Sequence, residues 1–272
     1  MKLFDEHCHL QDPRVYRVAP QLIQTALDSG VLHFAVNGIT EKDWHLVKQM
    51  GERYPRSVIP CFGLHPWFVA NRTANWFTTL KGYFDSTPNA TVGEIGLDKG
   101  SPARINEFED QVEVFRPQLE LAKELKKTVT IHCVSAFDDL LEIMQSVGHL
   151  PAGAILHSYL GSAEMVAPLA KLGAYFTISG HTMNFLSREK AKKMLKAVPT
   201  DRLLLETDSP DALPSWDVDS LHWVPGDDSK TLNQPANIHN VLSFAASMLE
   251  ISEAELAKIT YKNAMRLFSC QD

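Results

Sequence analysis

Six side chains of two chemical types follow or end apolar segments of this sequence. Histidine occupies four of these positions and a carboxylate two, namely His7, His9, Glu94, His132, His157 and Asp208. Imidazole nitrogens and carboxylate oxygens are ligands for divalent metals such as zinc and manganese. An uncompensated polar group in such a place would be costly to bury. Four imidazoles and two carboxylates are enough for two divalent ions that share one bridging carboxylate.

The segment His7-Cys8-His9 illustrates how a strand can direct two ligands to the same metal site. Side chains alternate across a strand, so His7 and His9 share one face with Asp5, and Cys8 points to the other. Taken alone, a histidine at a strand end is more often a hydrogen-bonded core residue than a ligand. Asp208 could cap the following loop or helix, and Glu94 could be a turn residue. The repetition of the pattern favours a metal site, because Glu94 is expected to end the fourth strand, His132 the fifth, His157 the sixth and Asp208 the eighth.

Short apolar segments alternate with longer amphipathic ones along the chain. The predicted strands are Leu3–His9, Val31–Asn37, Ser57–Gly63, Thr91–Gly96, Thr128–Cys133, Gly153–His157, Ala174–Ser179 and Arg202–Asp208. Eight such βα units, followed by further helices, predict an α/β fold: a (β/α)8 TIM barrel with additional C-terminal helices, in which residues 1–272 form one domain. A doubly wound open sheet is the alternative, since periodicity does not separate the two.

Three further residues are predicted to contact substrate. His65 ends the third strand, and Trp216 and Trp223 lie in the segment 209–234, which is rich in Pro, Asp and Ser and follows the last strand. In a barrel this segment lies over the carboxyl-terminal face, where such enzymes build their sites. The alternatives are a histidine that satisfies loop carbonyls and tryptophans that pack. The basic segment Arg188–Lys196 is expected to be a solvated outer helix face.

The composition restricts the partners and the compartment. The 272 residues include 26 Lys and Arg against 33 Asp and Glu, a net charge of −7, which excludes a protein that holds DNA or a membrane through a basic surface. The four cysteines form no Cys-x-x-Cys pair, and no apolar run approaches the length of a membrane span. The charged N-terminal residues are not typical of a signal peptide. We expect a cytoplasmic protein, with the nucleus as an alternative.

The same residues lie in segments that resemble the signature blocks of a known family. These are His7-Cys8-His9, Gly63-Leu64-His65-Pro66, Gly93-Glu94-Ile95-Gly96-Leu97-Asp98, Ile131-His132-Cys133, His157-Ser158 and Leu205-Glu206-Thr207-Asp208-Ser209-Pro210. They look like the TatD-related metal-dependent deoxyribonucleases of the amidohydrolase superfamily, from residue 5 to about residue 268. The resemblance implies a (β/α)8 hydrolase that binds divalent metal through the six residues named first and acts on phosphodiesters.

Roles for these residues follow from two-metal chemistry. We expect His7, His9 and Asp208 to hold one ion, His132 and His157 the other, and Glu94 to bridge them. Asp208 is the expected acceptor of the proton of the attacking water. The ligand set suits Zn or Mn, whereas the family resemblance implies Mg, so the identity of the two ions stays open.

DNA is the expected substrate, as single strands or duplex ends. Two dications can bind a scissile phosphate although the chain is acidic, which predicts an exonuclease that engages termini. We expect a monomer with no membrane association and no obligate protein partner.

The chain departs from the family pattern at three places, which leave the substrate open. Two positions after His132 many relatives carry an arginine, whereas this chain has Val134, followed by Ser135. After Asp98 many relatives have aromatic residues, whereas this chain has Lys99-Gly100. Where relatives commonly carry Asn-Glu-Pro, this chain has Asn233-Gln234-Pro235. The alternative is an amidohydrolase-type hydrolase of small esters, amides or lactones. A carboxylated lysine would favour that class, but Glu94 stands in the corresponding position. A non-enzymatic scaffold that keeps a structural metal is the third possibility.

Overall fold

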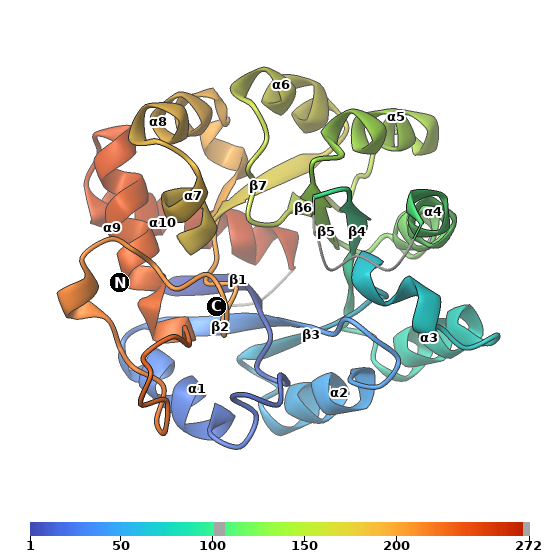
Figure 1. Ribbon diagram of the computed structural model, residues 1–272, viewed down its shortest axis with the longest axis horizontal. Helices are drawn as coiled ribbons and strands as arrows, with labels where there is room; N and C mark the ends of the chain where they lie inside the picture. The colour runs from blue at the N-terminus through green and yellow to red at the C-terminus, as the bar shows by residue number, and fades with distance from the viewer. Residues whose placement is uncertain (101–106, 269–272) are drawn as a thin grey trace. The chain divides into compact units, whose positions relative to one another are not determined.

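The computed structural model describes residues 1–100 and 107–268. Its strands alternate with helices in the predicted order (Figure 1). The strands are β1 (Leu3–Cys8), β2 (Val31–Asn37), β3 (Val58–Phe62), β4 (Thr91–Asp98), β5 (Val129–Val134), β6 (Ala154–Leu156), β7 (Ala174–Ile178) and β8 (Leu203–Leu205). They belong to one sheet in which the strand order follows the chain order.

Helices follow most of the strands, and two further helices end the chain as predicted. The α-helices are α1 (Ala19–Asp28), α2 (Trp44–Arg53), α3 (Trp76–Ser86), α4 (Phe108–Leu125), α5 (Phe137–Val147), α6 (Ala163–Lys171), α7 (Gly180–Phe185), α8 (Arg188–Ala197), α9 (Ile238–Leu249) and α10 (Glu253–Leu267). Short 3-10 helices are η1 (Pro66–Asn71), η2 (Thr200–Arg202), η3 (Val218–Ser220) and η4 (Pro235–Asn237).

The chain divides into two compact units. The first comprises Met1–Val36, Ser158–Ala167 and Phe176–Asp272. In it β1 pairs in parallel with β2, and β7 with β8. The last strand also lies beside the first, because the Asp208 amide donates to the His7 carbonyl at 2.9 Å and the His9 amide to the Ser209 carbonyl at 2.7 Å. An eighth strand beside the first is what closure of a barrel requires.

The second unit comprises Asn37–His157 and Pro168–Tyr175. Its strands β3, β4, β5 and β6 are parallel neighbours in that order. Helix α4 packs on β4 and carries two buried glutamines among its apolar residues. Gln118 exchanges hydrogen bonds with the backbone of Leu64, and Gln111 with the backbone of Asp98. These amides fix the backbone directly before His65 and at the end of β4.

Strand β4 differs from its prediction. It continues to Asp98, so Glu94 lies within the strand and not at its end. The register of β4 against β5 shifts between Val92 and Ile95, beside Glu94. Gly96 has φ of +154°, and a Cβ there would stand 2.0 Å from the His132 carbonyl oxygen. The glycine therefore lets the strand continue close to β5, and the two glycines around Glu94 mark an irregular strand where the sequence suggested a turn.

The apolar side chains of the strands and of the inner helix faces form the core. Cys8 and Cys133 are buried, as expected for residues that point away from a site on strand parity. Apolar residues recur at three- and four-residue steps in the segment Ile105–Lys127, which predicts a helix from the sequence. The structure confirms this helix from Phe108 to Leu125, and Ile105 lies outside the described residues. Among residues 1–100 and 107–268, no helix has the length and apolar character needed to cross a membrane. The prediction that residues 1–272 form one domain stays a prediction.

Candidate metal centres

Three histidines of the second unit converge on one carboxylate oxygen, that of Glu94. Oε1 of Glu94 lies 3.0 Å from Nε2 of His157, 3.3 Å from Nδ1 of His132 and 3.3 Å from Nε2 of His65. His132 belongs to β5, and His157 directly follows β6. His65 lies three residues after the end of β3. Only 3% of the Glu94 side chain is exposed. We call these four residues the Glu94 cluster.

Asp98 orients one of these histidines. Its Oδ2 lies 3.1 Å from Nε2 of His132 and accepts a 2.6 Å hydrogen bond from the Trp67 indole. A proton on Nε2 of His132 leaves a lone pair on Nδ1, which faces Glu94 and Nε2 of His157 at 3.2 Å. A carboxylate that holds the far nitrogen of a histidine is the usual support of a metal ligand.

The pKa of His132 reflects the negative charge of the carboxylates around it. Burial lowers the pKa of His132, but its hydrogen bonds with Asp98 and Glu94 outweigh burial, and the pKa is raised. The lone pairs of Glu94 and of the imidazole would repel each other if nothing positive lay between them. A proton or a metal cation removes that repulsion, so the residues present fit a divalent ion.

His65 has the opposite character. Its Nδ1 accepts a hydrogen bond from the Trp67 amide at 3.1 Å, so the proton of the neutral ring lies on Nε2 and points to Glu94. Burial lowers the pKa of His65 to about 4, which keeps the ring neutral at neutral pH. His65 is therefore a hydrogen-bond donor at this position, whereas His132 and His157 are better placed as metal ligands.

A second cluster lies in the first unit. Nε2 of His7 and Nε2 of His9 are 3.0 Å apart, and Oδ1 of Asp208 lies 3.7 and 3.6 Å from them. Two nitrogens that bind one ion at about 2.0–2.1 Å lie about 3 Å apart, so the histidine pair has a spacing suited to a shared metal. Oδ2 of Asp208 lies 3.2 Å from Nε2 of His181. His7, His9, His181 and Asp208 form the Asp208 cluster.

The backbone after β8 positions this carboxylate. Asp208 has φ of +54°, in the left-handed region, and its amide is held by the His7 carbonyl. At the preceding residue, the amide and hydroxyl of Thr207 donate to the two carboxyl oxygens of Asp5 at 2.8 and 2.6 Å. Burial raises the pKa of Asp5 to about 8, although the hydrogen bonds from Thr207 oppose the shift. The ends of β1 and β8 are thus fastened to each other beside the cluster.

The structure brings together all six predicted ligands, as one set within each unit. His7 lies with His9 and Asp208, and Glu94 lies with His132 and His157. Sequence reasoning missed His181 and Asp98. His181 follows β7 by three residues, so the rule that strand ends carry site residues could have found it. Asp98 stands in a segment already singled out, four residues after Glu94 and on the same face of β4.

The two loop tryptophans lie apart from these contacts. The Trp216 indole donates to the Ser243 hydroxyl at 3.3 Å, packs edge-on against Phe244 and lies under the Arg188 guanidinium at 4.9 Å. Trp223 is 37% exposed and has the Lys230 amine 5.3 Å from its ring. Trp216 is thus a packing residue in this structure, and a substrate role for either tryptophan stays a prediction.

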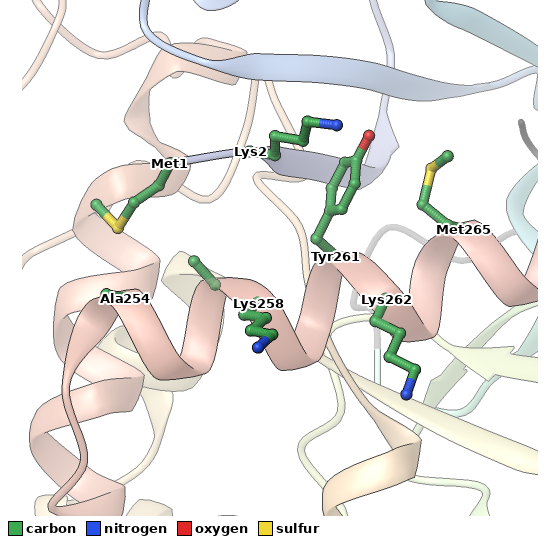
Figure 2. A pocket seen from close by; sticks show the side chains of 8 residues that line it. Met1, Lys2, Ala254, Lys258, Tyr261, Lys262 and Met265 are labelled. Atoms are coloured by element: carbon green, nitrogen blue, oxygen red, sulfur yellow. The ribbon is translucent and has the colours of Figure 1, made fainter. Parts of the chain in front are cut away.

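A pocket of about 460 Å³ lies elsewhere in the first unit (Figure 2). Its wall includes Lys2, which precedes β1, and Tyr261 and Lys262 of α10. His7 and His9 stand at the other end of β1. The residues that line the pocket are apolar, aromatic or lysine, so it contains no histidine, cysteine or carboxylate side chain.

Parallel βα units with clusters of histidines and carboxylates in and after their strands are typical of metal-dependent hydrolases of the (β/α)8 type. The solved structure of YJJV, a TatD homologue from Escherichia coli, has the same fold, with a TM-score of 0.86, 24% identity and coverage of 99% of this chain and 98% of the other. The predicted (β/α)8 barrel is therefore confirmed, and the open doubly wound sheet is not the fold.

The chain belongs to the TatD related DNase family, whose model matches residues 4–269. It is 31% identical to the "Uncharacterized metal-dependent hydrolase YabD" of Bacillus subtilis, with 98% of each chain covered. It is also 27% identical to the "3'-5' ssDNA/RNA exonuclease TatD" of Erwinia billingiae, again with 98% of each covered. The family resemblance stated from the sequence is confirmed, and the chain is an enzyme, a hydrolase of this family.

Proposed function

We propose that this chain is a divalent-metal-dependent deoxyribonuclease that removes nucleotides from the ends of DNA. One observation carries the proposal: each unit of a TatD-family chain holds its own cluster of histidines around a carboxylate. The family and the name of the Erwinia relative, a 3'-5' ssDNA/RNA exonuclease, support a nucleic-acid substrate. The net charge of −7 supports local engagement of a terminus over binding along a duplex.

The proposal assigns one ion to each cluster. His7, His9 and Asp208 would hold one, and His132 and His157 the other, with Glu94 as the bridging carboxylate expected from the sequence. Mixed imidazole and carboxylate ligands suit Zn or Mn, and Mg remains open from the family resemblance. The proton-bearing Nε2 of His132 is already held by Asp98, which supports its Nδ1 as the ligand atom.

Divalent ions bound there would lower the pKa of a water molecule toward neutrality and offset the charge of the phosphodiester. Asp208 would accept the proton of the water that attacks phosphorus, while the P–O bond to the leaving sugar oxygen breaks and that oxygen takes a proton from solvent. The two oxygens of Asp208 have different partners: Oδ1 faces His7 and His9, and Oδ2 lies against His181. A carboxylate oriented in this way can deprotonate the water at a fixed position.

His65 stabilises the phosphate in this scheme. Its neutral ring directs the Nε2 proton at Oε1 of Glu94, and in this proposal the donor turns to a phosphoryl oxygen when substrate enters. Buried donors aimed at developing negative charge contribute strongly to catalysis. This role agrees with the substrate contact predicted from the sequence.

The test is release of mononucleotides from end-labelled linear DNA by purified protein with added Mg²⁺, Mn²⁺ or Zn²⁺. We expect metal-dependent release from linear DNA and little cutting of covalently closed circles. Rapid cutting of circles would contradict the exonuclease mode. No release from any DNA, with hydrolysis of small esters or lactones, would instead support the alternative amidohydrolase-type function.

Variants connect this activity to the clusters. Glu94→Ala and Asp208→Ala should abolish release and remain folded, because the packing of the strands and helices does not depend on these groups. Asp219→Ala, at an exposed carboxylate of η3, is the matched control and should retain full activity. The same preparations, weighed by light scattering, test whether the protein is a monomer.

A further inference from the structure

Phe185, the last residue of α7, exposes 68% of its surface. This is the largest exposed fraction among the large apolar residues at the surface of the described chain. Single exposed apolar residues are common and need no explanation by themselves. What distinguishes Phe185 is the group on which its ring lies.

The Phe185 ring is stacked on a member of the Asp208 cluster. Its centroid lies 5.3 Å from that of His181, with an interplanar angle of 24°. His181 in turn places Nε2 3.2 Å from Oδ2 of Asp208. One imidazole ring therefore separates the exposed phenyl ring from the carboxylate that the proposed mechanism uses.

The backbone beneath this pair is fixed at both ends of α7. The Ser179 side chain accepts from the helix backbone in a capping box that includes Thr182. Gly180 lies so close to the next loop that a Cβ would stand 1.8 Å from the Ala212 carbonyl oxygen. Near the end of the helix, the Asn184 amide donates to the Leu213 carbonyl at 3.1 Å. The ring is thus presented by an ordered segment, as a preorganised contact requires.

We propose that the open face of Phe185 is the stacking platform for the base of the terminal nucleotide. The inference rests on the proposed nuclease function and identifies the terminal base as a part of the substrate that this chain binds. A nucleotide whose phosphate lies at Asp208 carries its base one sugar away, which is the step that the His181 ring spans. Every base has an aromatic face, so the contact holds nucleotides without reading their sequence.

Charge next to the platform supports a nucleic acid over an apolar partner. Arg188 follows Phe185 by three residues at the start of α8, and its guanidinium is held over the Trp216 ring at 4.9 Å. Lys190 follows in the first turn of α8, whereas the later lysines of this helix are paired with Glu250 and Glu164. A nucleic-acid strand offers both an aromatic base and the phosphates that these cations attract.

The platform also predicts strand selectivity. A base can stack on Phe185 only when it is unpaired, so a duplex end must fray before its terminal base is held. Removal of the ring should therefore weaken action on single strands more than action on blunt duplexes. No change in the metal clusters is required for this effect.

The test uses 2-aminopurine at one or the other end of a single-stranded oligonucleotide, with non-hydrolysable phosphorothioate linkages at the ends. Stacking on an aromatic ring quenches this base, so binding is read without turnover. With the metal-loaded wild-type protein we expect quenching at one end. Phe185→Ala should lose the quenching and bind the oligonucleotide at least about fivefold more weakly. Phe185→Trp should keep the quenching and the affinity. Leu125→Ala, at the exposed end of α4, is the control and should match wild type.

Kinetics give the second readout. Phe185→Ala should raise KM for single-stranded DNA by about five- to a hundredfold, with a smaller change in kcat, and the difference should vanish on a strand with an abasic terminal nucleotide. If Phe185→Ala equals wild type in quench and KM while wild type degrades DNA, the platform is wrong. If wild type degrades no nucleic acid, the proposed nuclease function fails instead.

Discussion

The two clusters contain the same kinds of side chain but differ in packing. In the Glu94 cluster, three imidazoles lie within 3.3 Å of one oxygen of a carboxylate that is 3% exposed. In the Asp208 cluster, the carboxylate is 9% exposed and His181 is 28% exposed. The first cluster also has a supporting carboxylate, Asp98, that is held by an indole, whereas the second borders an exposed aromatic ring.

This difference suggests a division of labour. A buried, tightly packed ligand set with an outer carboxylate is suited to retain an ion and to exclude water from it. A carboxylate at a more open position, fixed by the backbone and by a histidine, is suited to exchange protons with water and to meet substrate. We infer that the Glu94 cluster anchors metal and that the Asp208 cluster carries out the proton transfer.

The largest effect is expected from Glu94→Ala. Loss of the central carboxylate removes a ligand and leaves imidazoles without the negative charge that attracts a cation. Nuclease activity should fall by more than about 10⁴-fold, together with metal bound at this cluster. Metal content and nucleotide release, measured on one preparation, check this. His149→Ala, at an exposed histidine, should change neither.

A different pattern is expected from Asp208→Asn. The amide cannot accept the proton, so nucleotide release should fall by about 10²–10⁴-fold. The metal of the Glu94 cluster should remain, since no ligand there is altered. If both ions were lost, or if activity fell by less than tenfold, the assigned division between the two clusters would be incorrect.

Asp98→Asn is expected to have an intermediate effect. It keeps the shape of the side chain but removes the charge that holds Nε2 of His132. Metal affinity should fall by about 10–100-fold, and added metal should restore most of the activity. Titration of activity against free metal checks this. Trp67→Phe removes the hydrogen bond to Asp98 but keeps an aromatic ring beside His65 and His132, so it should shift the same curve less.

The smallest effect concerns a histidine outside both clusters. Burial lowers the pKa of His239, whose Nε2 lies 3.0 Å from the Ser29 carbonyl oxygen. Below the unfolded pKa of about 6.5, the unfolded chain binds a proton that the folded chain resists, so stability is lost as pH falls. His239→Gln should flatten this loss between pH 7 and 5. Urea unfolding of the metal-free protein measures it, and an unchanged slope would show that other groups dominate.

The sequence predicted the fold, and it predicted which side chains lie close together, because both depend largely on the strands and the residues that follow them. Alternating apolar segments located the eight strands, and histidines after β1, in β5 and after β6 were recognisable as polar residues in costly positions. The family resemblance was carried by the same residues. These features are local in the chain, so a single sequence contains them.

The supporting residues required the structure. The contact of His181 with Asp208 depends on α7, whose six residues have no helical repeat long enough to predict. The position of Glu94 inside β4 depends on a register shift that only pairing with β5 reveals. The role of Gln118 at Leu64 joins positions 54 residues apart, and one sequence carries no signal for such a pair.

Metal stoichiometry tests the central claim most directly. Protein equilibrated with Mn²⁺ or Zn²⁺ is dialysed, and its metal content is measured for wild type, for His7→Ala with His9→Ala, and for His132→Ala with His157→Ala. The account predicts two ions in the wild type and one in each double variant, with nuclease activity only in the wild type. A metal-free wild type, or two ions in either double variant, would contradict it.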